Sequence, residues 1–471
     1  MTIADCNSTY LHFIPLWNKC RDIVMGEEKV KAMGNIYLPK PSGMDNEDYE
    51  GYKGRAQFFN ATGRTLDGLS GMMNRKPPMV TVPKGMEKYL ENVDGKGHSL
   101  TQFINFCSRE NLTTAWGGVL VDMPVNKGAV SMRDFEELNI SAYMVYYPAE
   151  SIINWKFDNN GRQQFLRYVI FKEIVEENSS PYTTEKKERY RVCEIDKTGY
   201  YKQTVYNYKG EVALEVYPTN KEGKLTQIPF YFLSSSERPE VPILNDLINV
   251  NLSHYRKSAD YENGLHWTGV PTPWVQGVDV DEKNGEAGEA KPLKLGGCTL
   301  LYLPSGASMQ YLEFSGSGCS QLATAMRADE DRMAILGARI ISQERNGVEA
   351  AETAKIHRAG ENSVLAEIAI NLSIVFKKIL KIYLEWSASY AISDEDIDVR
   401  INTDYDVATM SPAELTALVA LWQSGGIAKR DLFDNLKNGE ILSADRNFDE
   451  MNAEIDEEQM AKVSFQNNSE E

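Results

Sequence analysis

Hydrophobic residues recur at helical spacing over most of residues 1–130, which predicts a mainly helical N-terminal region. In 99–117, a serine that can cap a helix precedes Phe103, Phe106 and Leu112, which lie near one stripe. The stretch that follows, GGVLVDMPV, is a short apolar run and predicts a buried strand.

The pattern changes between about 140 and 233. Short segments rich in aromatic and β-branched residues, such as FLRYVIFKEIVEE, RYRVCEI, KQTVYNY and IPFYFL, alternate with turn-forming segments such as DNNGRQQ and DKTGYY. This alternation predicts a largely antiparallel sheet.

Helical spacing returns at 242–266, where Pro242 suits the first turn. One face of this helix carries Leu244, Leu247, Ile248, Leu252 and Tyr255. An insert follows, in which CTLLYLPSGASMQYLEF predicts two strands around a Pro-Ser-Gly turn. Helix resumes at about 318, breaks at RIISQERNG and continues as a long helix over 349–387.

The C-terminal part predicts a strand, DIDVRIN, and two helices, SPAELTALVALWQSG and AKRDLFDNLKNG. From 446 onward acids outnumber bases and apolar residues are few, so we expect this end to be mobile. Together the patterns predict an α+β fold.

Composition narrows the function classes. The 471 residues suffice for two to four structural units, and the net charge of −18 argues against a general nucleic-acid coat. That charge still permits a surface past which DNA slides without sticking. The six cysteines lack a C-x-x-C pair, which is typical of a reduced intracellular protein. We expect no signal peptide and no membrane span, because charges interrupt the most apolar helix, 365–386.

The segment GRTLDGLSGMMNRKPP (63–78) combines helical apolar spacing with three glycines. A phosphate-binding loop would require G-x-x-x-x-G-K-[ST], which the chain lacks. We therefore expect a helix in which Gly68 and Gly71 let a neighbouring element pack very close.

Catalytic and metal-binding motifs are missing from the sequence. The five histidines are widely spread, and neither H-E-x-x-H nor G-x-S-x-G occurs. Acid pairs are numerous enough to be solvated helix faces. We expect no enzyme, no catalytic residue, no metal site and no cofactor.

Five blocks of the chain resemble the portal proteins of tailed bacteriophages, the first and third of them a podovirus-type branch. They are YEGYKGRAQFFNATGRTLDGLSGMMNRKPP, YYPAESIINW, IPFYFLSSSERPEVPILNDLINVNLSHYRKSADYENGLHWTGVPTPWV, GVEAAETAKIHRAGENSVL and SPAELTALVALWQSGGIAKRDLFDNL. The likeness extends over nearly the whole chain in the order of its blocks, and none of them is a catalytic motif.

The resemblance implies a portal fold, mainly helical, with a β-rich wing and a small β clip. The implied regions are the wing (1–241, helical over 1–130 and β-rich over 131–241), stem helices 242–266 and 318–337, the clip 267–317, the tunnel loop 338–348, a wing and crown helix 349–389, the crown 390–445 and the acidic end 446–471.

The same resemblance implies a ring of usually twelve copies at one capsid vertex of the virion, assembled in the host cytoplasm, with double-stranded DNA passing through it. Implied partners are the terminase, capsid and scaffolding proteins and a tail adaptor. The tunnel-loop candidates for facing DNA are Arg339, Gln343, Arg345 and Asn346, although this segment also suits a solvated turn between helices. Candidate clip anchors for a partner are Trp267, Trp274 and Tyr302, which could equally fill the clip core.

Two other functions fit the sequence less well. A terminase subunit is disfavoured by the missing nucleotide-binding loop. A head–tail adaptor or minor capsid protein is the closer alternative, and it is disfavoured by the helix–insert–helix–loop–helix order.

Overall fold

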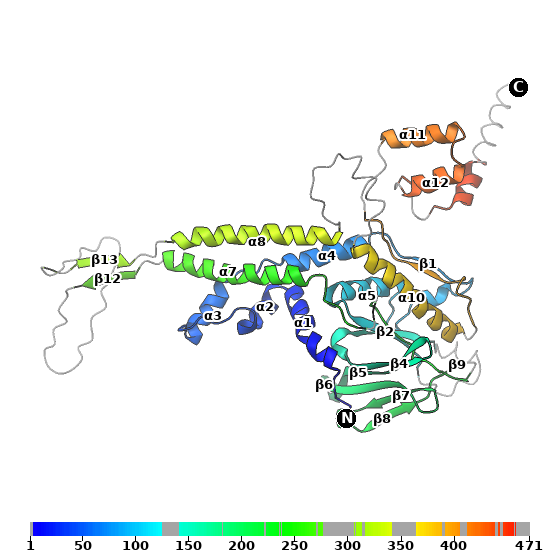
Figure 1. Ribbon diagram of the computed structural model, residues 1–471, viewed down its shortest axis with the longest axis horizontal. Coiled ribbons are helices and arrows are strands. Elements are labelled where there is room, and N and C mark those ends of the chain that lie inside the picture. Colours follow the sequence, from blue (N-terminus) through cyan, green and yellow to red (C-terminus); the bar gives the residue numbers. More distant parts are fainter. Residues whose placement is uncertain are drawn as a thin grey trace. The chain divides into compact units, whose positions relative to one another are not determined.

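The computed structural model (Figure 1) describes residues 3–124, 141–180, 182–220, 223–234, 236, 238–269, 272–276, 306, 308–312, 316–341, 364–388, 391–405, 412–438, 441–442, 446–455 and 457. The chain forms two compact units, 1–403 and 404–471. Helices and strands occupy largely separate stretches, so the fold is α+β as predicted.

The first unit begins with helices α1 (Ser8–Met25), α2 (Glu27–Ala32), α3 (Asn46–Arg55), α4 (Ala61–Met73) and α5 (Leu100–Thr114), with short 3-10 turns η1 (Gly34–Ile36) and η2 (Glu87–Leu90). Ser99 caps α5 as predicted, and it forms a capping box with Gln102. The predicted stripe is wrong at Phe106, which is half exposed and stacks edge-on against Tyr146. Cys107 takes the buried position instead, since it lies four residues after Phe103.

The glycine-rich segment forms helix α4, as predicted, but the expected close packing is wrong for the described part of this chain. Gly68 and Gly71 are exposed, and a Cβ at either would meet nothing within 4 Å. The helical period turns Leu66 and Leu69 inward, which places both glycines on the outer face. Gly63 is the tightly held glycine, since a Cβ there would lie 2.6 Å from the capping side chain of the preceding turn.

Strand β2 (Gly117–Asp122) is fully buried, as the apolar run predicted, and lies between β3 (Tyr143–Pro148) and β11 (Phe230–Phe232) in an antiparallel sheet. A glycine is required at position 118, because a Cβ would lie 2.2 Å from the Phe230 ring. This sheet provides part of the main core, which also contains Trp17 and Trp116.

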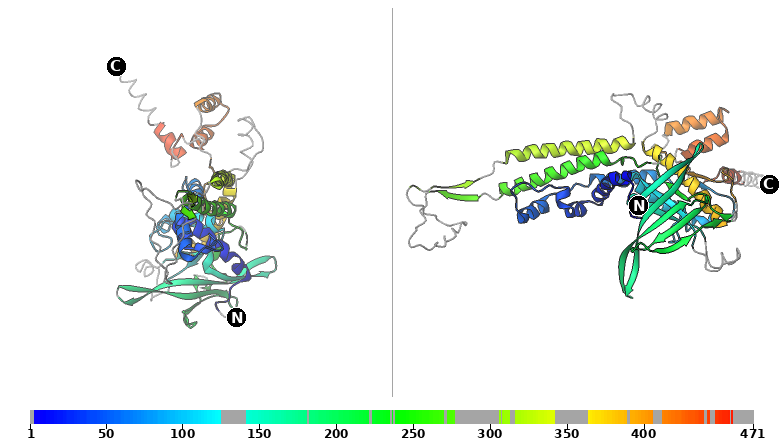
Figure 2. Two further views of the ribbon diagram at one scale, coloured as in Figure 1. Left: turned by 90° about the vertical axis from the view of Figure 1, so that its left-hand side faces the viewer. Right: turned by 60° about the horizontal axis from the view of Figure 1, so that its bottom comes forward.

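The predicted antiparallel sheet is confirmed as a five-stranded meander. Its strands are β4 (Ile152–Asn160), β5 (Gln163–Ser180), β6 (Thr183–Ile195), β7 (Tyr201–Tyr206) and β8 (Val212–Val216), each paired with the next. A 3-10 turn, η3 (Ala149–Ser151), precedes it, and β9 (Thr219–Asn220) and β10 (Gly223–Lys224) form a small pair beyond it. Figure 2 shows that β5 and β6 continue as a two-stranded ribbon beyond their neighbours.

Two long helices, α7 (Asn245–Gly269) and α8 (Ser317–Ile341), pack against each other (Figure 1). Between them β12 (Thr272–Gln276) pairs antiparallel with β13 (Ser308–Leu312). Both helices are predicted, with shifted ends. Helix α7 starts after Pro242, whose carbonyl accepts the Asn245 N–H, and it extends to Gly269. Helix α8 includes 338–341, which the sequence assigned to a loop.

Helix α10 (Val364–Ala388) is the described part of the predicted long helix, whose segment 349–363 lies outside the described residues. The predicted C-terminal strand is confirmed as β14 (Asp398–Arg400), which pairs with β1 (Met79–Thr81). Tyr383 of α10 donates a hydrogen bond to the Tyr89 carbonyl at 2.8 Å.

The second unit contains the two predicted helices, α11 (Pro412–Gln423) and α12 (Lys429–Asn438). The acidic end, expected to be mobile, is helical over 448–455. Phe448 packs edge-on against the buried Phe433 of α12, with ring centroids 5.4 Å apart. One aromatic contact thus anchors a segment whose composition alone suggested no fixed structure.

Candidate interaction surface on the helical hairpin

The N-terminal half of α7, residues 245–257, is called its inner half. It is buried along the predicted apolar face, which begins at Leu244 just before the helix. Leu244, Leu247, Ile248, Leu252 and Tyr255 are each at most 5% exposed. Burial raises the pKa of Tyr255 to about 12, so this phenol stays protonated at neutral pH.

Polar side chains also attach α7 to the N-terminal helices. The buried Asn251 accepts hydrogen bonds from the Thr62 N–H at 3.2 Å and the Thr62 hydroxyl at 2.9 Å, and it donates to the Phe59 carbonyl at 2.8 Å. The Tyr52 hydroxyl donates to Asp260 at 2.6 Å. Burial and this carboxylate raise the pKa of Tyr52. Because these polar groups are paired, the inner half of α7 is held in one position.

An ion pair and a histidine–carboxylate contact join α7 to α8. Lys257 donates to Asp329 at 2.7 Å, and the Asp329 side chain is only 2% exposed. Arg332 lies 3.5 Å from the same carboxylate. One turn earlier on α7, His254 lies 3.3 Å from Glu330. A buried carboxylate that needs its cation fixes how the two helices align.

The outer end of the hairpin is covered far less. No residue of 261–269 is buried, and Cys319 is the single buried residue of 317–328 in α8. Leu265, Trp267 and Trp274 are 42%, 54% and 38% exposed. We call these three side chains the outer apolar group. Aromatic residues of this kind are enriched in the centres of protein interfaces.

Three of the seven predicted site residues lie in described helices or strands, and the other four do not. Trp267 lies in α7 rather than in the insert, and Trp274 lies on β12, so both belong to the outer part of the hairpin. Arg339 lies in the last turn of α8. Tyr302, Gln343, Arg345 and Asn346 lie outside the described residues.

Leu265 belongs to the outer apolar group but was missed by the sequence analysis. It lies eighteen residues, or five helical turns, after Leu247, so it continues the apolar face of α7 into the part of the helix that is not buried. An apolar residue that continues the stripe beyond the buried part of a helix is a candidate for contact with another molecule.

A second concave region, of about 750 Å³, is lined mainly by α1, α5 and β3. In it, Arg21 forms ion pairs with Glu110, at 2.8 Å, and with Glu150. Burial alone would raise the pKa of Asp94, but hydrogen bonds from His98 and two backbone N–H groups hold it below its ordinary value. These pairings leave the cavity's acids bound to cations or N–H donors.

Three of the buried thiols are poor nucleophiles. Burial raises the pKa of Cys20 and Cys193 to about 12, and it also raises the pKa of Cys107. Across the described residues, no group of three or more His, Cys, Asp or Glu side chains could hold a metal ion. Within the same residues, no helix combines the length and apolar character of a membrane span.

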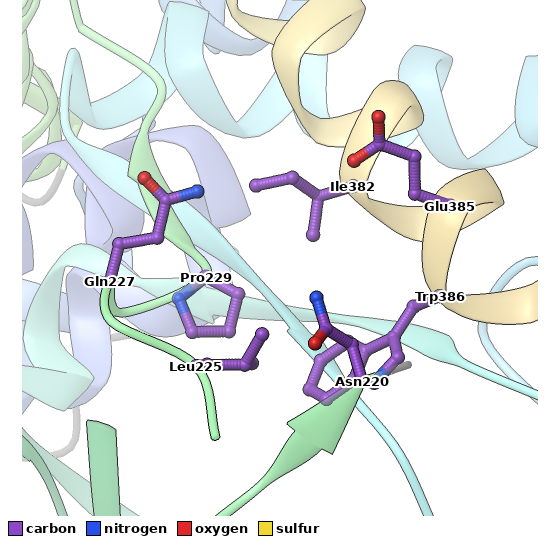
Figure 3. A pocket seen from close by; sticks show the side chains of 7 residues that line it. All are labelled: Asn220, Leu225, Gln227, Pro229, Ile382, Glu385 and Trp386. Atoms are coloured by element: carbon purple, nitrogen blue, oxygen red, sulfur yellow. The ribbon is translucent and has the colours of Figure 1, made fainter. Parts of the chain in front are cut away.

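A third cavity, of about 80 Å³, separates α10 from the segment between β9 and β11 (Figure 3). It lies far below the volume of small-molecule sites. Trp386 lines it and donates to the Thr219 carbonyl at 3.0 Å. We therefore interpret this cavity as a gap in the packing of α10 against the segment between β9 and β11.

Residues 242–387 match a family described as a domain of unknown function, DUF4055. The matched segment contains the helical hairpin and almost all of α10, a minority of the chain. No curated protein matches the sequence significantly.

Solved structures with a distant likeness come from gene transfer agent particles. A chain of the native virion is 11% identical, with a TM-score of 0.36, and the match covers 85% of this chain and 95% of that one. A chain in the neck of the empty particle is 12% identical, with a TM-score of 0.35 and coverage of 78% and 86%. A chain in the native neck is 11% identical, with a TM-score of 0.33 and coverage of 85% and 95%. Such TM-scores support no statement about the role of this chain.

Proposed function

We propose that this chain is a portal subunit of a tailed-phage-like particle, a structural rather than catalytic protein. The observation that supports the proposal most is the hairpin formed by α7, the paired strands β12 and β13, and α8. It has the helix–insert–helix order of the stem and clip that the sequence resemblance implies, and its outer end is uncovered.

A closed ring requires two different surfaces on each chain. In such a ring each copy presents one surface to the preceding copy and another to the next. The outer face of α4, with Gly68 and Gly71, and the half-exposed Ile335 on α8 are suitable surfaces for such contacts. The ring would contain about twelve copies, as in the family that the sequence resembles.

The proposed ring lies at one vertex of the capsid. It contacts the capsid and scaffolding proteins there, and double-stranded DNA passes through it. Arg339, Gln343, Arg345 and Asn346 would face the channel. The net charge of −18 would limit adhesion, since each neutralised phosphate adds salt-sensitive affinity. The outer apolar group would dock the terminase first and a tail adaptor later.

Native mass spectrometry with negative-stain imaging of the purified chain tests the proposal. A ring with an axial hole wide enough for a duplex supports it, and a closed oligomer without a hole contradicts it. If the chain stays monomeric alone, antibody labelling of intact particles decides. Label at a single vertex supports the proposal, and label elsewhere or none at all contradicts it.

A further inference from the structure

A cavity of about 380 Å³ lies between α1, the turn η1 and α7. Figure 1 shows α1 next to the inner half of α7, where this cavity is found. Its lining residues are Pro15, Lys19, Ile36, Tyr37, Asn249, Leu252 and Arg256. Among the described residues this lining contains two cations and no carboxylate.

Both cations are held by neutral oxygen atoms. The Lys19 ammonium donates to the amide oxygens of Asn245, at 3.2 Å, and Asn249, at 3.0 Å. The Arg256 Nε donates to the Tyr37 carbonyl at 2.9 Å. Amide and carbonyl acceptors orient a cation but do not neutralise it, so both positive charges remain available.

The neighbouring cations behave differently. Arg21, two residues after Lys19, forms ion pairs with two glutamates. Lys257, directly after Arg256, forms an ion pair with the buried Asp329. In a chain with 68 acids and 50 Lys and Arg, two cations that face one cavity whose described lining has no carboxylate are a distinct local arrangement.

Donors also remain for a ligand. A lysine has three N–H groups, of which the two asparagines use two, and an arginine has five, of which the carbonyl uses one. The buried Asp22 of α1 is already engaged by the Tyr37 hydroxyl at 2.7 Å and by Lys29 at 3.5 Å. That carboxylate is absent from the cavity lining.

We propose that this cavity binds a phosphate group. The planar guanidinium matches two phosphate oxygens, and the ammonium supplies a compact second charge. The phosphate could belong to the backbone of duplex DNA or be a free phosphate ion, and the two sources present the same oxygen atoms. The site does not depend on the portal proposal.

The test uses calorimetric titration of the full chain with inorganic phosphate and, separately, with a short labelled DNA duplex. Lys19→Gln with Arg256→Gln removes both cations. The matched control, Lys186→Gln with Arg400→Gln, removes two cations whose side chains are each 74% exposed. We expect saturable phosphate binding by the parent and the control, and roughly tenfold or greater weakening in the cavity variant.

Asn249→Asp is a second variant of nearly unchanged size. It places a carboxylate beside Lys19 and should abolish phosphate binding while the melting temperature stays close to that of the parent. Duplex binding that phosphate displaces, and that both cavity variants lose, identifies the DNA backbone as the source. Phosphate binding without duplex binding identifies the free ion. The inference is overturned if the parent shows no saturable phosphate binding, or if the cavity variant and the control bind equally.

Discussion

The contact between Lys257 and Asp329 should control how firmly α8 is held against α7. Replacing Lys257 with Met leaves a carboxylate that is 2% exposed and that, among the described residues, has Arg332 at 3.5 Å as its remaining cation. Removing one partner of a buried ion pair costs about 3–5 kcal/mol. Because Arg332 remains, we expect a loss near the lower end, about 3 kcal/mol.

The reverse change should cost less. In Asp329→Asn the amide oxygen can still accept from Lys257, and the lysine side chain is already 30% exposed, so it can reach water. We expect a loss of about 1 kcal/mol. Replacing both residues, as in Lys257→Met with Asp329→Leu, removes the charges together and should bring stability back to within about 1 kcal/mol of the parent.

The chain offers a matched control. The pair Lys187–Glu177 has the same 2.7 Å separation and the same 30% exposure of its lysine, but its glutamate is 56% exposed. Lys187→Met should therefore change stability far less than Lys257→Met does. The burial of the acid is the main difference between the two pairs, although Lys187 also lies over the Tyr208 ring at 5.3 Å.

Hydrogen exchange of the α8 amides, followed by mass spectrometry, measures the opening of this helix directly. This assigns the opening to α8 itself, whereas a melt reports the stability of the chain as a whole. Equal losses for Lys257→Met and Lys187→Met would refute the reasoning, because burial of the carboxylate would then have no effect. A double variant as unstable as Lys257→Met would refute it as well.

Three further changes have defined expectations. Asn251→Ala should destabilise the chain by roughly 3 kcal/mol, since it leaves buried groups unpaired, and thermal melting beside Asn263→Ala measures this. Tyr255→Phe should stabilise it by about 1 kcal/mol, because the buried hydroxyl has no partner among the described residues. As the folded pKa of Tyr255 is raised to about 12, the parent should lose stability as the pH rises from 10 through 12, and the Phe variant should lose less in alkaline melts. Trp267→Ala with Trp274→Ala should leave melting unchanged but weaken partner docking about 30-fold or more in a binding titration, and unchanged docking would contradict the proposed surface.

Local patterns were sufficient to predict most elements of the fold. The apolar face of α7, the buried strand β2 and the antiparallel meander follow from side-chain period alone. The ends of helices were predicted less accurately, since α7 and α8 each extend beyond their predicted C-terminal limits. The errors at Phe106 and Gly68 share a cause. A sequence shows which residues could lie on a packed face, whereas the tertiary contacts determine which face is covered.

The two candidate sites differ in how far a sequence can predict them. A cavity with Lys19 on α1 and Arg256 on α7 joins residues far apart in the chain, and the overall negative charge obscures a local positive pair. The outer apolar group lies within a short segment, and its signal is the exposure of large apolar residues beyond the buried part of α7. The inner half of α7 is buried along the helical stripe, whereas Leu265, which continues that stripe, and Trp267, which lies off it, are both exposed. Since folding alone does not explain large exposed apolar side chains in that position, the outer end of α7 is the place where a partner is most reasonably sought.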